Sequence, residues 1–219
     1  MKSFATGVRA EVEAKLRTFL GSADQGLALI ELREISNTKA TLWLTETYLS
    51  TLLGLAKDGV APGKVLVVVE EAHTVMPEAS FAGLGDFDSK GIIAKITQIA
   101  LQGRKYGVGL LVLAQRTATV SKSVLTQCNT VISFACVDDT SINFLRNVFG
   151  SAIAESLPGL RKLRAVAHGP WIRSQIPITF DVPFDQAKAD VTDWASQVAS
   201  RGVSGTTATP TDMDSTPPF

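Results

Sequence analysis

The chain has 219 residues, 45% of them hydrophobic, and its 21 Lys and Arg residues are balanced by 21 Asp and Glu residues. This length and composition predict one sizeable α/β core with at most a small appendage. The charge balance excludes a global basic field of the kind that by itself indicates a nucleic-acid binder, but it leaves room for a local basic surface. No apolar run approaches the ~18 residues of a membrane helix, and Met1 leads into a polar segment rather than a signal peptide. We therefore expect a soluble cytoplasmic protein without membrane partners.

Apolar residues recur at helical spacing in some segments and run continuously in others, which separates predicted helices from predicted strands. From residue 27 to residue 150 the two kinds alternate, a pattern typical of βαβ units and a parallel sheet. In chain order the predicted elements are a helix at 4–20, a strand at 26–34, a helix within 36–59, a strand at 65–69, a helix at 90–102, strands at 107–116 and 130–136, and a helix at 140–149. Ser36 or Asn37 would cap the second helix, and Gly59 lies beyond its end.

The pattern changes after Leu157. Residues 163–168 and 172–180 are separated by a Gly-Pro pair, which predicts an antiparallel pair of strands rather than another crossover unit. The tail from Arg201 lacks aliphatic periodicity and is expected to be flexible. The predicted fold class is α/β, with a mostly parallel sheet flanked by helices and a C-terminal antiparallel β pair.

The cysteines and histidines do not form a metal-binding pattern. Cys128 and Cys136 flank a predicted strand, and His73 and His168 lie far apart in the sequence. Neither set has the spacing of zinc ligands. We expect the cysteines to be small buried thiols in a reducing compartment.

Polar side chains directly follow two of the predicted strands. Residues 31–34, at the end of the predicted strand at 26–34, are a weaker third example of a polar strand end. Glu70 and Glu71 end the run VLVVV, and Gln115 and Arg116 end the run GVGLLVLA. Ligands of open parallel sheets gather at the carboxyl ends of the strands. In P-loop nucleotide hydrolases, one carboxylate at such an end contacts Mg²⁺ through water and a second polarises the attacking water. The two ends together favour a nucleotide site, and solvated strand ends are the alternative.

Each of these residues has a distinct candidate role. Glu70 would take the metal role through a bound water, and Glu71 would be the general base. Gln115 offers a donor and an acceptor that can sense a γ-phosphate or orient the water, and Arg116 adds a cation for nucleotide phosphates. Arg104 lies at the end of a predicted helix, where a cation stabilises the helix dipole. Its alternative role is to reach a phosphate oxygen in the same or a neighbouring subunit, as arginine fingers do.

Three segments together resemble the HerA/FtsK class of RecA-like motor ATPases, and more closely its HerA-like branch. They are VLVVVEEAH, GRKYGVGLLVLAQR and VSKSVLTQCNTVISFACVDDTSINFLRN, in the order and spacing of that family. The resemblance covers roughly residues 26–180. It implies ATP hydrolysis, with ATP and Mg²⁺ as cofactors, in a hexameric ring that pumps double-stranded DNA. Such proteins often act beside a partner nuclease in end resection or in antiphage defence.

By position in this family, Glu70 and Glu71 match the acidic Walker B strand end, Gln115 the sensor, and Arg104 the arginine near the γ-phosphate. DEAH-box helicases also carry Glu-Ala-His, but they begin the acidic box with Asp and place Ser-Ala-Thr after the next strand. This sequence has Glu at the first position and Ala-Gln-Arg after that strand, which favours the HerA-like assignment.

Three further positions match the family. His73 resembles the last residue of the acidic box, where we expect it to support the loop rather than to perform chemistry. Gln127 and Asn129 resemble a polar segment before the next strand, with an interface role. The implied organisation is an N-terminal helical segment at 1–25, the C-terminal part of a RecA-like ATPase core at 26–182, a helix at 183–200 and a flexible tail at 201–219.

A phosphate-binding loop of the form G-x-x-x-x-G-K-[ST] is not present in the sequence. The nearest segment, GVAPGKV at 59–65, has three residues between its glycines, ends in Val and precedes a strand rather than a helix. In the family this loop lies N-terminal to the residues found here. We therefore expect a chain that carries the Walker B and sensor residues without the P-loop, and that hydrolyses ATP poorly or not at all by itself.

Two other functions stay open. One is a non-catalytic RecA-like module that assembles or binds a partner protein, and the other is part of a conjugation-type coupling ATPase. DNA contacts are not located by the sequence, and an ordinary solvated surface is the alternative at every candidate. The candidate basic positions are Lys122, Arg146, Arg161, Lys162 and Arg164.

Overall fold

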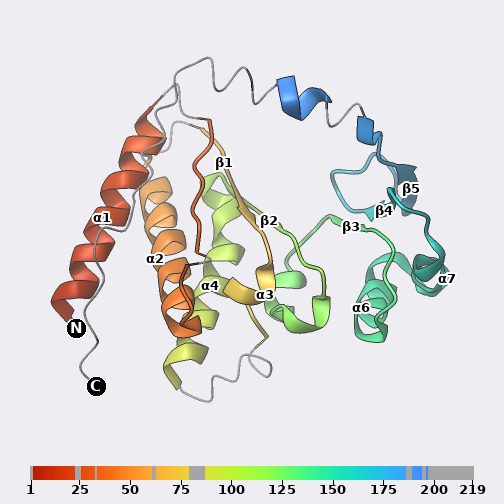
Figure 1. The fold of residues 1–219 in the computed structure, drawn as a ribbon, viewed down its shortest axis with the longest axis horizontal. Helices are drawn as coiled ribbons and strands as arrows, with labels where there is room; N and C mark the ends of the chain where they lie inside the picture. The colour runs from red at the N-terminus through yellow and green to blue at the C-terminus, as the bar shows by residue number, and fades with distance from the viewer. Residues whose placement is uncertain are drawn as a thin grey trace. The chain divides into compact units, whose positions relative to one another are not determined.

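A computed structural model describes residues 2–22, 26–32, 34–60, 63–78, 87–185, 189–193 and 196 (Figure 1). The chain divides into two compact units, Met1–Asp181 and Val182–Phe219. In the second unit, the described residues 189–193 are helical. Within the described part of the chain, no helix combines the length and the apolar character needed to cross a membrane.

The first unit begins with two long helices, α1 (Lys2–Gly21) and α2 (Thr38–Lys57). The side chain of Asn37 caps α2, because it accepts hydrogen bonds from two main-chain N–H groups of the first turn, at 2.9 and 3.1 Å. Beyond the other end of α2, Gly59 has a φ of +71°, in the left-handed region that glycine adopts at little cost. The predicted cap and end of this helix are therefore confirmed.

Two parallel strands follow, β1 (Val65–Val69) and β2 (Val108–Val112), paired from Val65↔Val108 to Val69↔Val112. The connection between them contains the short helix α3 (Ala72–Val75), the long helix α4 (Phe87–Gly103) and one turn of 3₁₀ helix, η1 (Arg104–Tyr106). The long connection is what a parallel pair requires, since the chain must return to the starting edge of the sheet.

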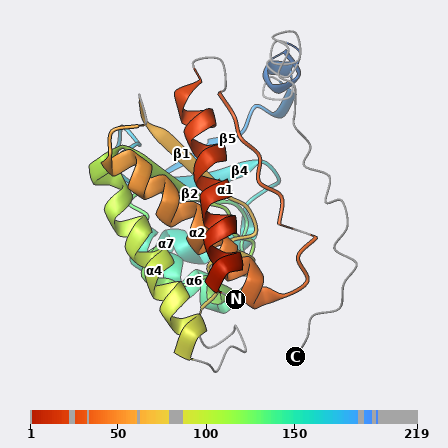
Figure 2. The same ribbon diagram turned by 90° about the vertical axis from the view of Figure 1, so that its left-hand side faces the viewer.

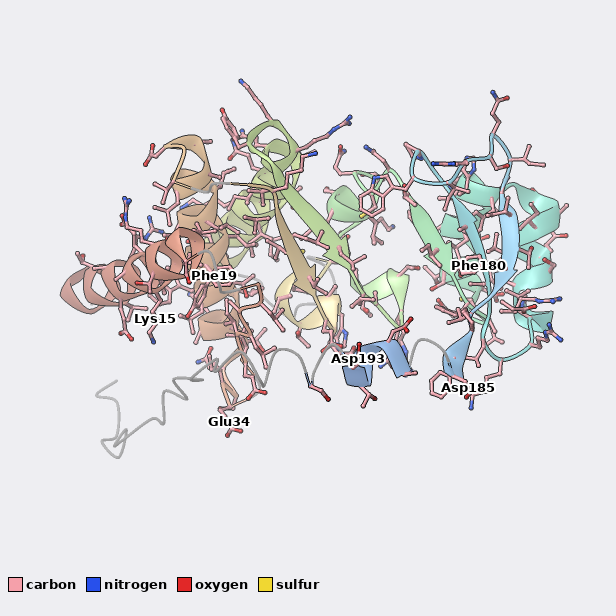
Figure 3. The ribbon with its side chains drawn as sticks, turned by 90° about the horizontal axis from the view of Figure 1, so that it is seen from above. Lys15, Phe19, Glu34, Phe180, Asp185 and Asp193 are labelled. Carbon is pink, nitrogen blue, oxygen red and sulfur yellow. The ribbon has the colours of Figure 1, made fainter. Side chains whose placement is uncertain are left out.

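Helices cover one face of this parallel pair, and Figure 2 shows α1, α2 and α4 beside one another. Alternate strand residues point into this helical layer, because successive side chains of a strand face opposite ways. The main cluster contains Leu42, Leu49, Val69, Ile93 and Ile96, with Val67, Leu110 and Val112 packed against it. A second cluster attaches α1 through Val12, Leu16 and Leu20, with Phe19 (labelled in Figure 3) at its margin. This one-sided burial fixes the orientation of both strands.

The opposite face of the parallel pair is open. Leu66 and Val68 of β1 are 53% and 52% exposed, and Leu111 of β2 and the following Leu113 are 39% and 43% exposed. Parallel strands are normally covered on both faces and carry apolar residues on both. We name Leu66, Val68, Leu111 and Leu113 the open face.

The rest of the unit is an antiparallel sheet with two helices packed on it. Its strand order is β3-β4-β5, and both pairs are antiparallel. Val166 at the centre of the sheet packs into a cluster with residues of the two helices. The elements of this part are β3 (Val131–Ser133), α6 (Asp139–Phe149), α7 (Ser151–Ser156), η3 (Leu157–Gly159), β4 (Arg164–His168) and β5 (Ile178–Asp181). Before it, η2 (Thr117–Thr119) and α5 (Lys122–Leu125) follow β2, and α5 packs into the main cluster of the parallel pair.

The structure confirms the predicted α/β class, with a parallel part and an antiparallel part, and differs in three details. Residues 26–32 are not part of a strand, and Leu27 and Leu29 there are 62% and 80% exposed. The strands predicted at 107–116, 130–136 and 172–180 are shorter, as β2, β3 and β5. In addition, β3 pairs with β4 instead of joining the parallel strands. A continuous apolar run marks a segment able to form a strand, but the strand forms only where a neighbour offers backbone partners.

Candidate functional site

The carboxyl ends of β1 and β2 lie at the same edge of the parallel pair. Val69 and Val112 are paired, so the residues that follow them emerge together. The ladder continues beyond the strands, because the N–H of Leu113 donates to the carbonyl of Val69 at 2.9 Å and the N–H of Ala72 donates to the carbonyl of Leu113 at 3.0 Å. This edge is where ligands of open parallel sheets gather.

Glu71 makes the sharp turn that ends β1. Its φ of 45° and ψ of 52° place it in the left-handed region, which costs a residue with a side chain about 1–2 kcal/mol. The turn is held by Thr74, whose N–H and hydroxyl both donate to the Glu71 carbonyl, at 2.8 and 2.9 Å. The next residue, Ala72, is fully buried. The main chain therefore projects the Glu71 side chain outward from a fixed point.

The two oxygens of the Glu71 carboxylate have different partners. The Gln115 side-chain amide donates to Glu71 Oε1 at 2.6 Å. His73 Nδ1 lies 3.3 Å from Glu71 Oε2. The side chains of Glu71 and His73 are 47% and 45% exposed, so the cluster is open to a ligand from solvent. The structure thus brings together Glu71 and Gln115, the residues predicted at the two strand ends, and adds His73.

Glu70 lies exposed at the same turn, beside this cluster. Mg²⁺ prefers oxygen ligands and is usually held by one or two carboxylates together with the phosphates of a substrate. In the described part of the chain, no group of three or more His, Cys, Asp or Glu residues could hold a metal ion.

Arg116 follows Gln115 and is exposed. The next residue, Thr117, donates through its hydroxyl to the Ser141 hydroxyl at 2.8 Å, and the Ser141 hydroxyl donates to Asp138 at 2.6 Å. Hydrogen bonds from Ser141 hold the pKa of the Asp138 carboxyl below its usual range, and the charge of Arg116 adds to this effect. The network fixes the end of β2 to the start of α6.

Arg104 lies at the amino-terminal end of β2, whereas Glu71 follows the carboxyl end of β1. It belongs to η1, which precedes β2, whereas Gln115 follows β2. A strand of five residues spans about 16 Å at ~3.3 Å per residue. The structure therefore does not bring Arg104 together with Glu71 and Gln115 within one chain.

Several candidate basic positions are paired. Asp181 accepts hydrogen bonds from Arg161 at 2.7 Å and from Arg164 at 2.8 and 2.9 Å, and these bonds hold its pKa well below the usual range. Arg146 donates to Asn143 at 2.7 Å and lies 3.5 Å from Glu155. These pairs reduce the positive charge available to a DNA phosphate. Lys122 and Lys162 are exposed.

The remaining candidate positions follow α5 and β3. Gln127 and Asn129 are exposed between α5 and β3. Cys128 and Cys136 are free thiols, both partly buried, and burial raises the pKa of the Cys128 thiol.

A cleft beside the cluster was not predicted from the sequence. It has a volume of about 420 Å³ and lies between the start of α2 and the α3 turn. His73 connects it to Glu71, and most of its other lining groups are hydroxyls. Its lining residues are Ile35, Ser36, Thr38, Thr41, His73, Thr74, Pro77 and Thr119. The sequence shows Ser36, Thr38 and Thr41 near the start of α2, but only the fold places these hydroxyl side chains in one cleft with His73.

In sequence, the chain is similar to archaeal helicases. The DNA double-strand break repair helicase HerA of Pyrococcus furiosus is 31% identical over 112 residues, which are 50% of this chain and 19% of that protein. A probable helicase of Methanocaldococcus jannaschii is 35% identical over 108 residues, 48% of this chain and 19% of that protein. These matches span about a fifth of the length of the curated relatives. No family model matches the chain.

In fold, the chain is similar to the genome packaging NTPase B204 from Sulfolobus turreted icosahedral virus 2, solved in complex with AMPPCP. The TM-score is 0.51 at 14% identity, covering 75% of this chain and 70% of that one. At this identity the likeness concerns the fold alone. In sequence, the chain is similar to HerA helicases over about half of its own length.

Proposed function

We propose that residues 26–182 form the C-terminal part of the ATPase core of a HerA-like DNA translocase. The observation that carries this proposal is the hydrogen bond between Gln115 and Glu71, which joins the ends of two parallel strands at 2.6 Å. A carboxylate and a carboxamide in contact at this edge are the groups that a nucleotide hydrolase needs beside a γ-phosphate. The HerA-like sequence and the P-loop ATPase fold support the same function.

A phosphate-binding strand, loop and helix from another segment would complete the site. In the described part of the chain, β2 pairs only with β1. The main-chain groups on the side of β2 that faces away from β1 can therefore accept a further parallel strand. The open face would then be covered by the helix that follows that strand. Because a loop after a parallel strand emerges at the carboxyl edge, it would arrive beside Glu71 and Gln115.

The residues of this chain then have defined tasks. Glu71 would accept a proton from the attacking water, and Gln115 would orient that water or contact the γ-phosphate. Glu70 would hold Mg²⁺ through a water molecule, and Arg116 would lie near the phosphates. When bound, Mg²⁺ would supply charge stabilisation for the transferred phosphoryl group.

Arg104 would act in a neighbouring subunit. It is exposed at the amino-terminal end of β2, and Glu71 lies at the other end of the parallel pair. Arg104 therefore cannot serve the site of its own chain, but it can face the site of the next chain in a ring. The resemblance to HerA-like proteins supports a hexameric ring with double-stranded DNA as its cargo as part of this proposal. A nuclease or other effector would be a further partner of that assembly.

A non-catalytic assembly module is the second candidate. The open face favours it as well, because four apolar side chains at 39–53% exposure can bind a partner without any chemistry. In that case the Glu71 and Gln115 pair would only stabilise the turn. The two functions differ in whether loss of the Glu71 carboxylate abolishes ATP hydrolysis.

The test compares ATP hydrolysis by the 219-residue chain with hydrolysis by the native protein that joins these residues to a phosphate-binding loop. We expect the chain by itself to be inactive. In the native protein, Glu71→Gln should lower kcat by about 10²–10⁴-fold, as loss of a general base does, with nucleotide still bound. The matched surface variant Glu155→Gln should leave kcat unchanged.

Two outcomes would contradict the proposal. Robust hydrolysis by the chain alone, lost in Glu71→Gln, would contradict the expectation that a phosphate-binding loop is missing. An unchanged kcat in Glu71→Gln would contradict the role of Glu71 as the general base.

A further inference from the structure

The Glu71 turn contains more constraint than a simple end of a strand requires. Glu71 occupies the left-handed region without being Gly, and Thr74 makes two hydrogen bonds to its carbonyl. These contacts fix the main chain, but the Glu71 side chain has several rotatable bonds beyond Cα and would still move freely. Only the partners of its two carboxylate oxygens can hold it in one direction.

Those partners come from different places. Gln115 approaches Oε1 from the end of β2, and His73 approaches Oε2 from the first turn of α3. The Gln115 side chain also has a second N–H and a carbonyl oxygen, and turning these groups toward a water or a γ-phosphate would weaken its bond to Glu71. At that moment His73 is the remaining side chain that the described part of the chain places beside the carboxylate.

The surroundings of His73 argue against a purely structural role. Its neighbour Ala72 is fully buried and Val75 is 8% exposed, so these two residues anchor α3 in the core. The His73 side chain is 45% exposed and lines the cleft, where it adds little to packing. A side chain in that position acts on its polar neighbour more than on the stability of the fold.

We propose that His73 is a positioning residue. It keeps the Glu71 carboxylate oriented toward the attacking water while Gln115 contacts that water or the γ-phosphate. This inference rests on the proposed function, because it matters for catalysis only if Glu71 is the base. It assigns to His73 an effect on kcat and not on nucleotide binding. Misplacing a reacting group by as little as 1 Å can cost about 10²-fold in rate.

The first experiment needs no nucleotide. The side-chain amide of Gln115 is observed by NMR in the ¹⁵N-labelled chain and identified by its loss in Gln115→Ala. In His73→Ala the Glu71 carboxylate becomes mobile, so solvent exchange of this amide should accelerate about threefold or more. His73→Asn places an amide nitrogen near the position of Nδ1 and should restore most of the protection. Lys95→Ala, an exposed change on α4, is the control and should leave it unaltered.

The second experiment measures steady-state ATP hydrolysis by the native protein with the same variants. His73→Ala should lower kcat about tenfold with KM within about twofold, and His73→Asn should recover most of that loss. The inference is overturned if His73→Ala leaves the exchange rate of the Gln115 amide unchanged. It is also overturned if His73→Ala leaves kcat unchanged. If the native protein hydrolyses no ATP, the proposed function fails, while the amide measurement still decides whether His73 holds Glu71.

Discussion

The antiparallel sheet and the parallel pair differ in how completely the chain surrounds them. In β4, the central strand of the antiparallel sheet, Ala165, Val166 and Ala167 are at most 1% exposed, and both neighbouring strands are present. In β2, Leu111 is 39% exposed, and the residue after the strand, Leu113, is 43% exposed. The antiparallel sheet thus buries its central strand, whereas both strands of the parallel pair are covered on one face only. The half with the open face is also the half that carries the polar strand-end cluster.

The sharpest test of this difference compares the two faces of the parallel pair. Leu42 of α2 is fully buried under the strands, and Leu66 of β1 is 53% exposed on the open face. Leu42→Ala should lower the free energy of unfolding by about 2–5 kcal/mol, because it removes buried contacts and leaves a cavity. Leu66→Ala should cost less than about 1 kcal/mol in the chain by itself. Urea unfolding followed by circular dichroism measures both values.

Equal losses in these two variants would show that the open face is buried in solution. If the phosphate-binding segment is added and covers that face, the cost of Leu66→Ala should rise toward that of a buried leucine. The comparison then reports directly on the occupant of the open face.

A smaller effect is expected where the two halves are joined. Ser141 at the start of α6 is 2% exposed and links Thr117, after β2, to Asp138. Ser141→Ala leaves both partners without this hydroxyl and should cost about 1–2 kcal/mol of unfolding free energy. Ser156→Ala removes an exposed hydroxyl that bonds only within its own helix and should stay within about 0.5 kcal/mol. Equal values for the two serines would contradict a joining role for Ser141.

The sequence predicted the parts of the fold that depend on local signals. Asn37 and Gly59 mark the limits of α2, and the Gly-Pro pair separates the strands of the antiparallel sheet. The contact between Glu71 and Gln115 also follows from sequence, since parallel strands end at one edge. The sequence left Arg104 as a candidate for a site in the same or a neighbouring subunit, and its place in η1, before β2, puts it at the amino-terminal end of that strand.

Other features depend on contacts that no local signal contains. The apolar run at 26–34 predicts a strand, but a strand needs a backbone partner, and residues 26–32 form none. The contact of His73 with Glu71 depends on a left-handed turn at a glutamate, where the sequence has no Gly or Asn to indicate it. The cleft brings the start of α2 close to α3, two segments more than 30 positions apart in the chain.

The smallest expected effect concerns Asp181 at the edge of the antiparallel sheet and depends on pH. Hydrogen bonds from Arg164 and Arg161 lower the pKa of this carboxyl from its ordinary value of 3.8. Because the folded state holds the charged form more strongly, the stabilisation is fully present above pH 3.8 and is lost as the pH falls from there toward the lower pKa of the folded state. Asp181→Asn should therefore unfold more readily in urea than the unchanged chain at pH 6, and the two should converge at strongly acidic pH. The pair is exposed, so added salt should reduce the difference. A difference that stays constant from pH 6 into the acid range would mean that the Asp181 charge is not its source.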